Sequence, residues 1–206
     1  MNDINIGSGH VTVSGQTQHG KSYFVKKVLL GKYQKNVFYD LKHDPAHEDI
    51  RIKYGVVKSV KDLKKFFEDG GKTVIYQPPF LDNKEAIAHF DSVCKYIFSV
   101  GNITIFNDEA AGLTSPSNIS KWYYVLITQG LSRGCNCINI TQSPTLCHNV
   151  ILSQSDYFIL FRHNVKSHRD KLAGIIGEAG GDRCGLLPKY RFIFVNPDKS
   201  YMEGQI

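Results

Sequence analysis

The chain lacks the long apolar runs that mark membrane-spanning and secreted proteins. No window approaches 18 uninterrupted apolar residues, and the first ten residues do not show the charged-then-apolar pattern of a secretion signal. There are 7 prolines, and we find no low-complexity segment and no internal repeat. We therefore expect a folded, soluble, intracellular protein with no membrane-spanning segment.

Cysteine pairs that would form disulfides or a zinc site are also lacking. The 5 cysteines are odd in number and include no C-x-x-C pair, which predicts free thiols in a reducing compartment. A zinc site could be imagined from Cys135, Cys137, Cys147 and His148. Because Cys135 and Cys137 flank a single residue at the start of an expected strand, we interpret them as small buried hydrophobic residues.

The length and charge of the chain limit its organisation and its partners. A chain of 206 residues suffices for one α/β domain with a substantial core, so we expect a single domain over residues 1–206. Lysine and arginine exceed aspartate and glutamate by 25 to 19, a formal net charge of +6. This balance suits a polyanionic partner, although nucleotide binding alone also favours basic residues.

The sequence contains a complete phosphate-binding loop. The motif G-x-x-x-x-G-K-[ST] is matched by Gly15, Gln16, Thr17, Gln18, His19, Gly20, Lys21 and Ser22. It follows a β-branched run and precedes an apolar pattern of helical spacing, which is the context that the motif needs. Backbone N–H groups in such a loop suit a triphosphate, the lysine reaches the β- and γ-phosphates, and the serine hydroxyl binds Mg²⁺. The predicted cofactors are therefore ATP and Mg²⁺.

A second acidic motif follows an apolar strand expected over residues 103–107. Asp108 can hold Mg²⁺ through its water shell, and Glu109 can orient and activate an attacking water. An ATPase needs a base for water, whereas a small-molecule kinase must keep water out. Glu109 therefore favours ATP hydrolysis.

A polar residue at the end of the next strand completes the predicted site. Gln142 follows the strand expected over residues 137–140, where an amide can hydrogen-bond both the γ-phosphate and the lytic water. Asp40 and Lys42 follow another short strand. They are expected near the nucleotide or a neighbouring subunit, although ordinary turn chemistry explains them almost as well.

The remaining pattern predicts an α/β fold with a mainly parallel central sheet flanked by helices. Helix N-termini are expected at Ser59-x-x-Asp62, at Asp82-x-x-Glu85, at Ser117 or Asn118, and at Ser167-x-x-Asp170. Residues 190–201, with an Asn-Pro-Asp turn, predict a C-terminal β-hairpin.

In this order, the motifs resemble those of the FtsK/HerA superfamily of ring-forming DNA-pumping ATPases. More narrowly, the chain is similar to the small genome-packaging ATPases of tailless double-jelly-roll viruses, from about Val11 to Arg162. The resemblance implies a RecA-like (ASCE) P-loop NTPase fold and a homo-oligomeric ring, hexameric or pentameric. It also implies double-stranded DNA and a viral capsid or vertex protein as partners, and a location in the host cytoplasm or with the virion.

The resemblance also implies a role for each motif residue. Lys21 and Ser22 would bind phosphate and Mg²⁺, Asp108 would support the metal, Glu109 would be the general base and Gln142 the γ-phosphate sensor. Such relatives complete the site with an arginine from the adjacent subunit, for which the candidates are, first, Arg133 and, second, Arg162. The chain departs from the common pattern here, because relatives carry an arginine nearer the position of Leu131 and often one at the position of Ser143.

Three functions compete at this stage. The first is an ATP-driven translocase that packages double-stranded DNA into a preformed capsid. The second is a P-loop phosphotransferase, which would need an arginine-rich lid over an acceptor pocket, and we find no such cluster. The third is a nucleotide-dependent assembly or scaffold protein, which would hydrolyse ATP slowly and ignore DNA.

Overall fold

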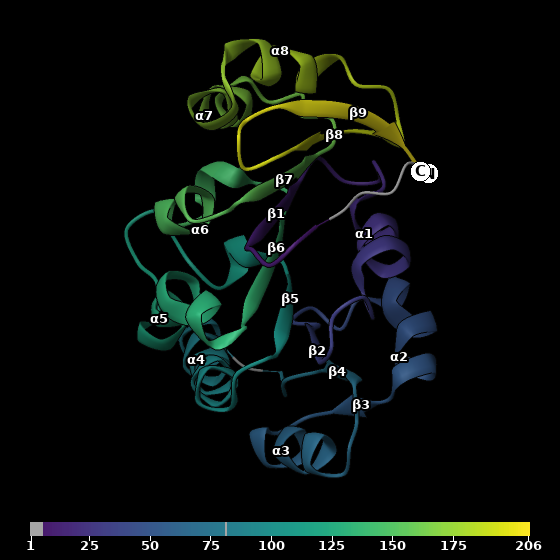
Figure 1. The fold of residues 1–206 in the computed structure, drawn as a ribbon, viewed down its shortest axis with the longest axis vertical. Helices are drawn as coiled ribbons and strands as arrows, with labels where there is room; N and C mark the ends of the chain where they lie inside the picture. Colours follow the sequence, from purple (N-terminus) through teal and green to yellow (C-terminus); the bar gives the residue numbers. More distant parts are fainter. Residues whose placement is uncertain (1–5, 81) are drawn as a thin grey trace.

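A nine-stranded sheet forms the centre of the computed structural model, which describes residues 6–80 and 82–206 (Figure 1). The first five residues, part of the N-terminal segment in which we expected no secretion signal, lie outside the described residues. The strand order is β3-β4-β2-β5-β6-β1-β7-β8-β9. Every pairing from β3 to β7 is parallel, and β8 and β9 are added antiparallel at one edge.

The strands are β1 (Val11–Ser14), β2 (Asn36–Tyr39), β3 (Val56–Val57), β4 (Thr73–Tyr76), β5 (Thr104–Asp108), β6 (Asn136–Thr141), β7 (Tyr157–Leu160), β8 (Arg191–Val195) and β9 (Tyr201–Gln205). The α-helices are α1 (Lys21–Phe24), α2 (Glu48–Tyr54), α3 (Val60–Glu68), α4 (Asn83–Val100), α5 (Lys121–Gln129), α6 (Asn149–Ser153), α7 (Lys166–Ile176) and α8 (Glu178–Leu186). A π-helical segment, Val25–Leu29, continues α1. Short 3₁₀ turns occupy Pro45–His47, Ala110–Gly112, Gly130–Arg133 and Pro144–Leu146.

Successive residues of the central strands are buried on opposite faces of the sheet. In β5, Ile105 packs into the cluster formed with α3, α4 and α5, whereas Phe106 packs into the cluster formed with α1 and α2. Cys137 and Ile138 of β6 divide between the two clusters in the same way. Both faces are therefore covered by helices, which is why these strands are almost continuously apolar.

A third cluster extends the core beneath the last two helices. Leu172 of α7 and Cys184 of α8 pack with Phe158 of β7 and Ile193 of β8. In Figure 1 these helices lie above β7 and β8, at the opposite end of the sheet from α3. Within the described residues, no helix is both long enough and apolar enough to cross a membrane.

The expected fold class is confirmed. The sheet is mainly parallel, helices flank both faces, and β8 and β9 form the C-terminal hairpin. Strand β6 lies between β1 and β5, which places it between the phosphate-loop strand and the Asp-Glu strand, as a RecA-like fold requires. The sequence pattern did not predict α2, β3, α6 or α8.

Two expected helix caps are present and two are wrong. The Ser59 side chain accepts a hydrogen bond from the Asp62 N–H, and Asp82 with Glu85 forms a complete capping box. Helix α5 begins after Ser120 rather than after Ser117 or Asn118, because the Asp91 carboxylate of α4 supplies the acceptor for its first turn. Helix α7 begins after Val165, so the segment from Ser167 to Asp170 is inside the helix.

The cap between α4 and α5 gives a prediction about stability. Oδ1 of Asp91 accepts hydrogen bonds from the N–H groups of Trp122 at 2.6 Å and Tyr123 at 3.3 Å. We expect Asp91→Ala to lower the free energy of unfolding by about 1 kcal/mol, the usual effect of losing a helix cap, as measured by urea denaturation. Asp170→Ala, which changes an exposed aspartate inside α7, serves as the control. Equal stabilities for the two variants would contradict this account of the cap.

Candidate functional site

The residues singled out by the motifs lie at the carboxyl ends of three neighbouring strands, β5, β6 and β1. β6 pairs in parallel with both β5 and β1, and β1 pairs with β7. The phosphate loop follows β1, Gln142 follows β6, and Asp108 and Glu109 lie at the end of β5. Because parallel strands end at the same edge of a sheet, these three segments meet there.

Close packing against β7 and the C-terminal segment gives the phosphate loop its shape. Gly20 has φ 108°, a conformation that side-chain-bearing residues rarely adopt. A methyl group on its Cα would collide with Ile206 and would lie 3.3 Å from ring carbons of Phe161 and Tyr190. The loop therefore needs glycine here for two reasons, backbone conformation and space.

Hydrogen bonds within the loop hold its side chains over the end of the sheet. The Gln16 N–H donates to the Arg162 carbonyl at 2.9 Å, and the Lys21 ammonium donates to the Gln16 carbonyl at 2.9 Å. The Thr17 hydroxyl donates to Oε1 of Gln142 at 2.7 Å. The proposed sensor residue thus contacts the phosphate loop directly.

Lys21 is buried at the centre of the site. Burial lowers the pKa of Lys21 to about 8, although the negative charges of Glu109 and Asp108 act in the opposite direction. Lys42 lowers the pKa further by like-charge repulsion. An ammonium in this position is stabilised by an added anion, which is the chemistry that a phosphate group would supply.

A buried network lies beneath Asp108, built from residues that follow β2 and β4, from the Pro45–His47 turn and from α2. Nε2 of His47 lies 3.6 Å from Oδ2 of Asp108, and Nδ1 of His47 lies 3.2 Å from Oδ1 of Asp40. Arg51 donates to the other oxygen of Asp40 at 2.9 Å, and Gln77 donates to the same atom at 2.9 Å. Asp40 and His47 are fully buried, so the network is a rigid support beneath Asp108.

Burial also shifts the pKa values in this network. It raises the pKa of Asp108 to about 6, against the opposing effect of the nearby His47. Burial alone would lower the pKa of His47, but the hydrogen bond with Asp40 and the charge of Asp108 outweigh it, so the pKa is raised. A cation beside Asp108 would favour its charged form.

Glu109 occupies a strained backbone conformation. Its φ of 120° and ψ of 70° lie in a region that non-glycine residues seldom adopt, at a cost of about 1–3 kcal/mol. The carboxylate accepts a hydrogen bond from the Lys42 ammonium at 3.0 Å and a longer one from the Thr141 hydroxyl at 3.4 Å. These contacts hold the side chain at the end of β5.

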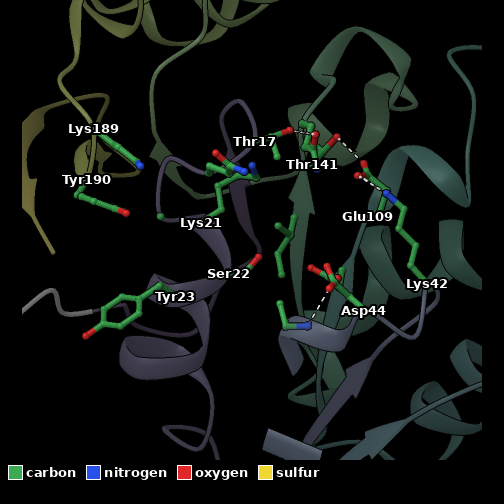
Figure 2. Close-up of a pocket in the computed structure, with 16 residues that line it drawn as sticks. Thr17, Lys21, Ser22, Tyr23, Lys42, Asp44, Glu109, Thr141, Lys189 and Tyr190 are labelled. Atoms are coloured by element: carbon green, nitrogen blue, oxygen red, sulfur yellow. Dashed lines mark hydrogen bonds and ion pairs between the residues drawn. The ribbon is translucent and has the colours of Figure 1, made fainter. Parts of the chain in front are cut away.

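These groups enclose a cavity of about 450 Å³, the size range of small-molecule sites. Figure 2 shows Glu109 and Lys42 on one side of it, Lys189 and Tyr190 on the other, and Lys21 and Ser22 between them. Three ammonium groups, the serine hydroxyl and the Asp108 carboxylate line the same space. This donor set, together with the close-packed Gly20, fits a phosphate chain with a divalent cation. Lys21 would bind the phosphates, and Ser22 and Asp108 would hold the cation.

The structure brings most of the predicted residues together and leaves two outside the cavity. Thr17, Gln18, Gly20, Lys21, Ser22, Asp108, Glu109 and Gln142 line it, and Gly15, Gln16 and His19 belong to the same loop.

Arg133 precedes β6, at the opposite end of the strand from Gln142. Its guanidinium donates to the Ser99 carbonyl at 2.9 Å and lies 5.1 Å from the centroid of the Phe98 ring. Arg162 lies beside the loop, and its guanidinium donates a hydrogen bond to Oδ1 of Asn164 at 2.8 Å. Within the described residues, no arginine lines the cavity.

Sequence reasoning missed several residues of the site. Tyr23, Lys189 and Tyr190 line the cavity, and His47 lies beneath Asp108. Lys189 and Tyr190 carry no local signal, because they reach the site only through the antiparallel pairing of β8 with β7. Lys42, which was expected near the nucleotide or a neighbouring subunit, lines the cavity and donates to Glu109 at 3.0 Å.

The fold and the phosphate loop together place the chain in the structural class of P-loop NTPases. Comparison with solved structures shows similarity to the genome-packaging NTPase B204 of Sulfolobus turreted icosahedral virus 2. In the sulfate complex of B204 the TM-score is 0.77 at 15% identity, covering 98% of this chain and 98% of that chain. In its AMPPCP complex the TM-score is 0.74 at 14% identity, covering 96% and 97%.

More distant structural similarity extends to larger proteins. The pCW3 conjugation coupling protein TcpA matches with a TM-score of 0.53 at 20% identity, over 96% of this chain and 60% of TcpA. EssC of Geobacillus thermodenitrificans matches with a TM-score of 0.55 at 12% identity, over 95% of this chain and 39% of that chain. No protein-family model and no curated protein sequence matches the chain. The resemblance seen in the motifs is thus confirmed at the level of the fold.

The buried network around Asp40 gives a prediction about stability. Arg51 is 12% exposed and its partner Asp40 is fully buried. Removing one partner of such a pair leaves an uncompensated buried charge, so we expect Arg51→Met to lower the free energy of unfolding by about 3 kcal/mol.

The matched control is Lys64→Met, which breaks an ion pair with Glu68 in which both side chains are 62% exposed. We expect a change below about 0.5 kcal/mol for this variant. Urea denaturation measures both variants, and the double substitution Arg51→Met with Asp40→Asn should recover part of the loss. If Arg51→Met destabilises no more than the control, the network does not support the site as described.

Proposed function

We propose that the chain is an ATP-driven translocase that moves double-stranded DNA into a viral capsid. The observation that carries the proposal is the meeting of Lys21, Asp108, Glu109 and Gln142, from three strand ends, around one cavity. The structural similarity to a genome-packaging NTPase supports the same function. The described residues would form the motor domain, acting in the host cytoplasm or with the virion.

The side chains suit hydrolysis of a nucleoside triphosphate. Lys21 and the loop N–H groups would bind the phosphates, and Ser22 and Asp108 would hold Mg²⁺, which neutralises phosphate charge when bound. Glu109 would accept a proton from the attacking water once the carboxylate exchanges its contacts with Lys42 and Thr141 for that water. Gln142, already bonded to Thr17, would hold the water or the terminal phosphate.

The lining of the cavity favours the motor over the phosphotransferase. No arginine lines it in the described part of the chain, so it lacks the arginine-rich lid that a phosphotransferase would need. A motor would receive its arginine from the adjacent subunit, Arg133 being the first candidate and Arg162 the second. A nucleotide-dependent scaffold remains the other alternative, and it differs from the motor in turnover.

Substitution of the proposed base tests the reaction. We expect Glu109→Gln to bind ATP with an affinity close to that of the unaltered chain, because phosphate binding rests on Lys21 and the loop. Turnover should fall at least a hundredfold, the scale of general-base catalysis. Calorimetry measures binding and phosphate release measures turnover, with Glu68→Gln on exposed α3 as the control. Unchanged turnover would remove Glu109 from the mechanism.

Dependence on DNA and salt separates the motor from the scaffold. We expect ATP turnover to rise when double-stranded DNA is added, and we expect this stimulation to weaken as salt rises, because backbone contacts release counterions. Phosphate release is measured against DNA concentration at several salt concentrations, while mass measurement gives the oligomeric state. Slow turnover that ignores DNA at every salt concentration would favour the scaffold.

A further inference from the structure

The cavity has a chemically distinct end that the proposed reaction does not use. Glu109 and Lys42 form one end, while Tyr23, Lys189 and Tyr190 line the other (Figure 2). Lys21 and Ser22 lie between the two ends. A nucleotide with its terminal phosphate at Glu109 would therefore extend its base away from the carboxylates, toward the two tyrosines.

Both tyrosines present uncovered aromatic surface. Tyr23 is 51% exposed and Tyr190 is 45% exposed, although both line the cavity. Aromatic rings left half uncovered beside a binding cavity are suited to stacking on a flat ligand, since a base–aromatic contact buries apolar surface on both partners.

The backbone fixes the position of Tyr190 beside the phosphate loop. Its ring carbon Cδ1 lies 3.3 Å from the position that a methyl group on Gly20 would occupy. The Tyr190 carbonyl accepts a hydrogen bond from the Ile206 N–H at 3.0 Å, and the Lys189 ammonium lies 5.0 Å from the ring centroid. The ring is thus held at the loop before any ligand arrives, which lowers the entropic cost of binding.

We propose that Tyr190 and Tyr23 form a stacking site for a purine base. The side chains at this end offer one ammonium, from Lys189, and two phenol hydroxyls, with no carboxylate or amide among the three. Purines offer a larger ring than pyrimidines for stacking on the tyrosines, and the ammonium can donate to N7, an acceptor that adenine and guanine share. The site therefore selects purines as a class and discriminates little between ATP and GTP. This inference rests on the proposed nucleotide site.

Binding measurements with and without a base test the inference. We measure dissociation constants by calorimetry, with Mg²⁺, for the methylene analogues of ATP, GTP and CTP and for inorganic tripolyphosphate. For the unaltered chain, the ATP and GTP analogues should bind within a few-fold of each other and at least several-fold more tightly than the CTP analogue.

The variants isolate the aromatic contact. Tyr190→Ala should weaken binding of the ATP analogue about tenfold or more, the scale of one lost base–aromatic contact, and Tyr23→Ala should weaken it in the same direction. Tyr190→Phe keeps the ring and should bind within about twofold of the unaltered chain. Tyr201→Ala, at a 46% exposed tyrosine of β9 that does not line the cavity, is the matched control.

Tripolyphosphate distinguishes this inference from the nucleotide site itself. Its affinity should be the same in all four variants, because it carries no base. An equal loss for tripolyphosphate and the ATP analogue in Tyr190→Ala would show that Tyr190 only shapes the loop, and would overturn the inference. Unchanged affinity of the ATP analogue in both Tyr190→Ala and Tyr23→Ala would also overturn it while the phosphate site stands. If the unaltered chain binds neither compound, the nucleotide site and the inference both fail.

Discussion

The geometry of the site depends on the register in which β6 pairs with its two neighbours. Ser14 of β1 is opposite Thr141, and Asp108 of β5 is opposite Ile140. This register brings the phosphate loop, Gln142 and the two carboxylates to one level at the edge of the sheet. A slip of one residue would also move the apolar residues of β6 to the wrong faces, so packing of the core enforces the arrangement of the site.

Burial gives the site its electrostatic character. The pKa of Lys21 is lowered to about 8 and that of Asp108 is raised to about 6, and in both residues burial is the largest cause. Burial disfavours the charged form of each of these two residues. An added anion near Lys21 and an added cation near Asp108 would each restore the charged form, so the two residues favour a ligand that carries both charges.

Local sequence signals predicted part of this structure and could not predict the rest. The phosphate loop, the Asp-Glu strand end and the Ser59 cap are each defined by residues close together in the chain. The first turn of α5 is capped by Asp91, 31 residues before Trp122, and so no spacing rule around Ser117 or Asn118 could find it. Lys189 and Tyr190 likewise reach the cavity through strand pairing, and His47 reaches Asp108 through a 3₁₀ turn, and neither carries a periodic pattern.

At Glu109, the backbone conformation that a glutamate prefers conflicts with the conformation that the site requires. Its positive φ turns the chain from β5 into a 3₁₀ turn, a conformation that a glutamate does not favour by itself. Its carboxylate is held by Lys42, which follows β2, and by Thr141, which ends β6. These are the two strands that flank β5 in the sheet. The position of the proposed base is thus set by its neighbours on both sides, and it can change only when one of those two contacts changes with it.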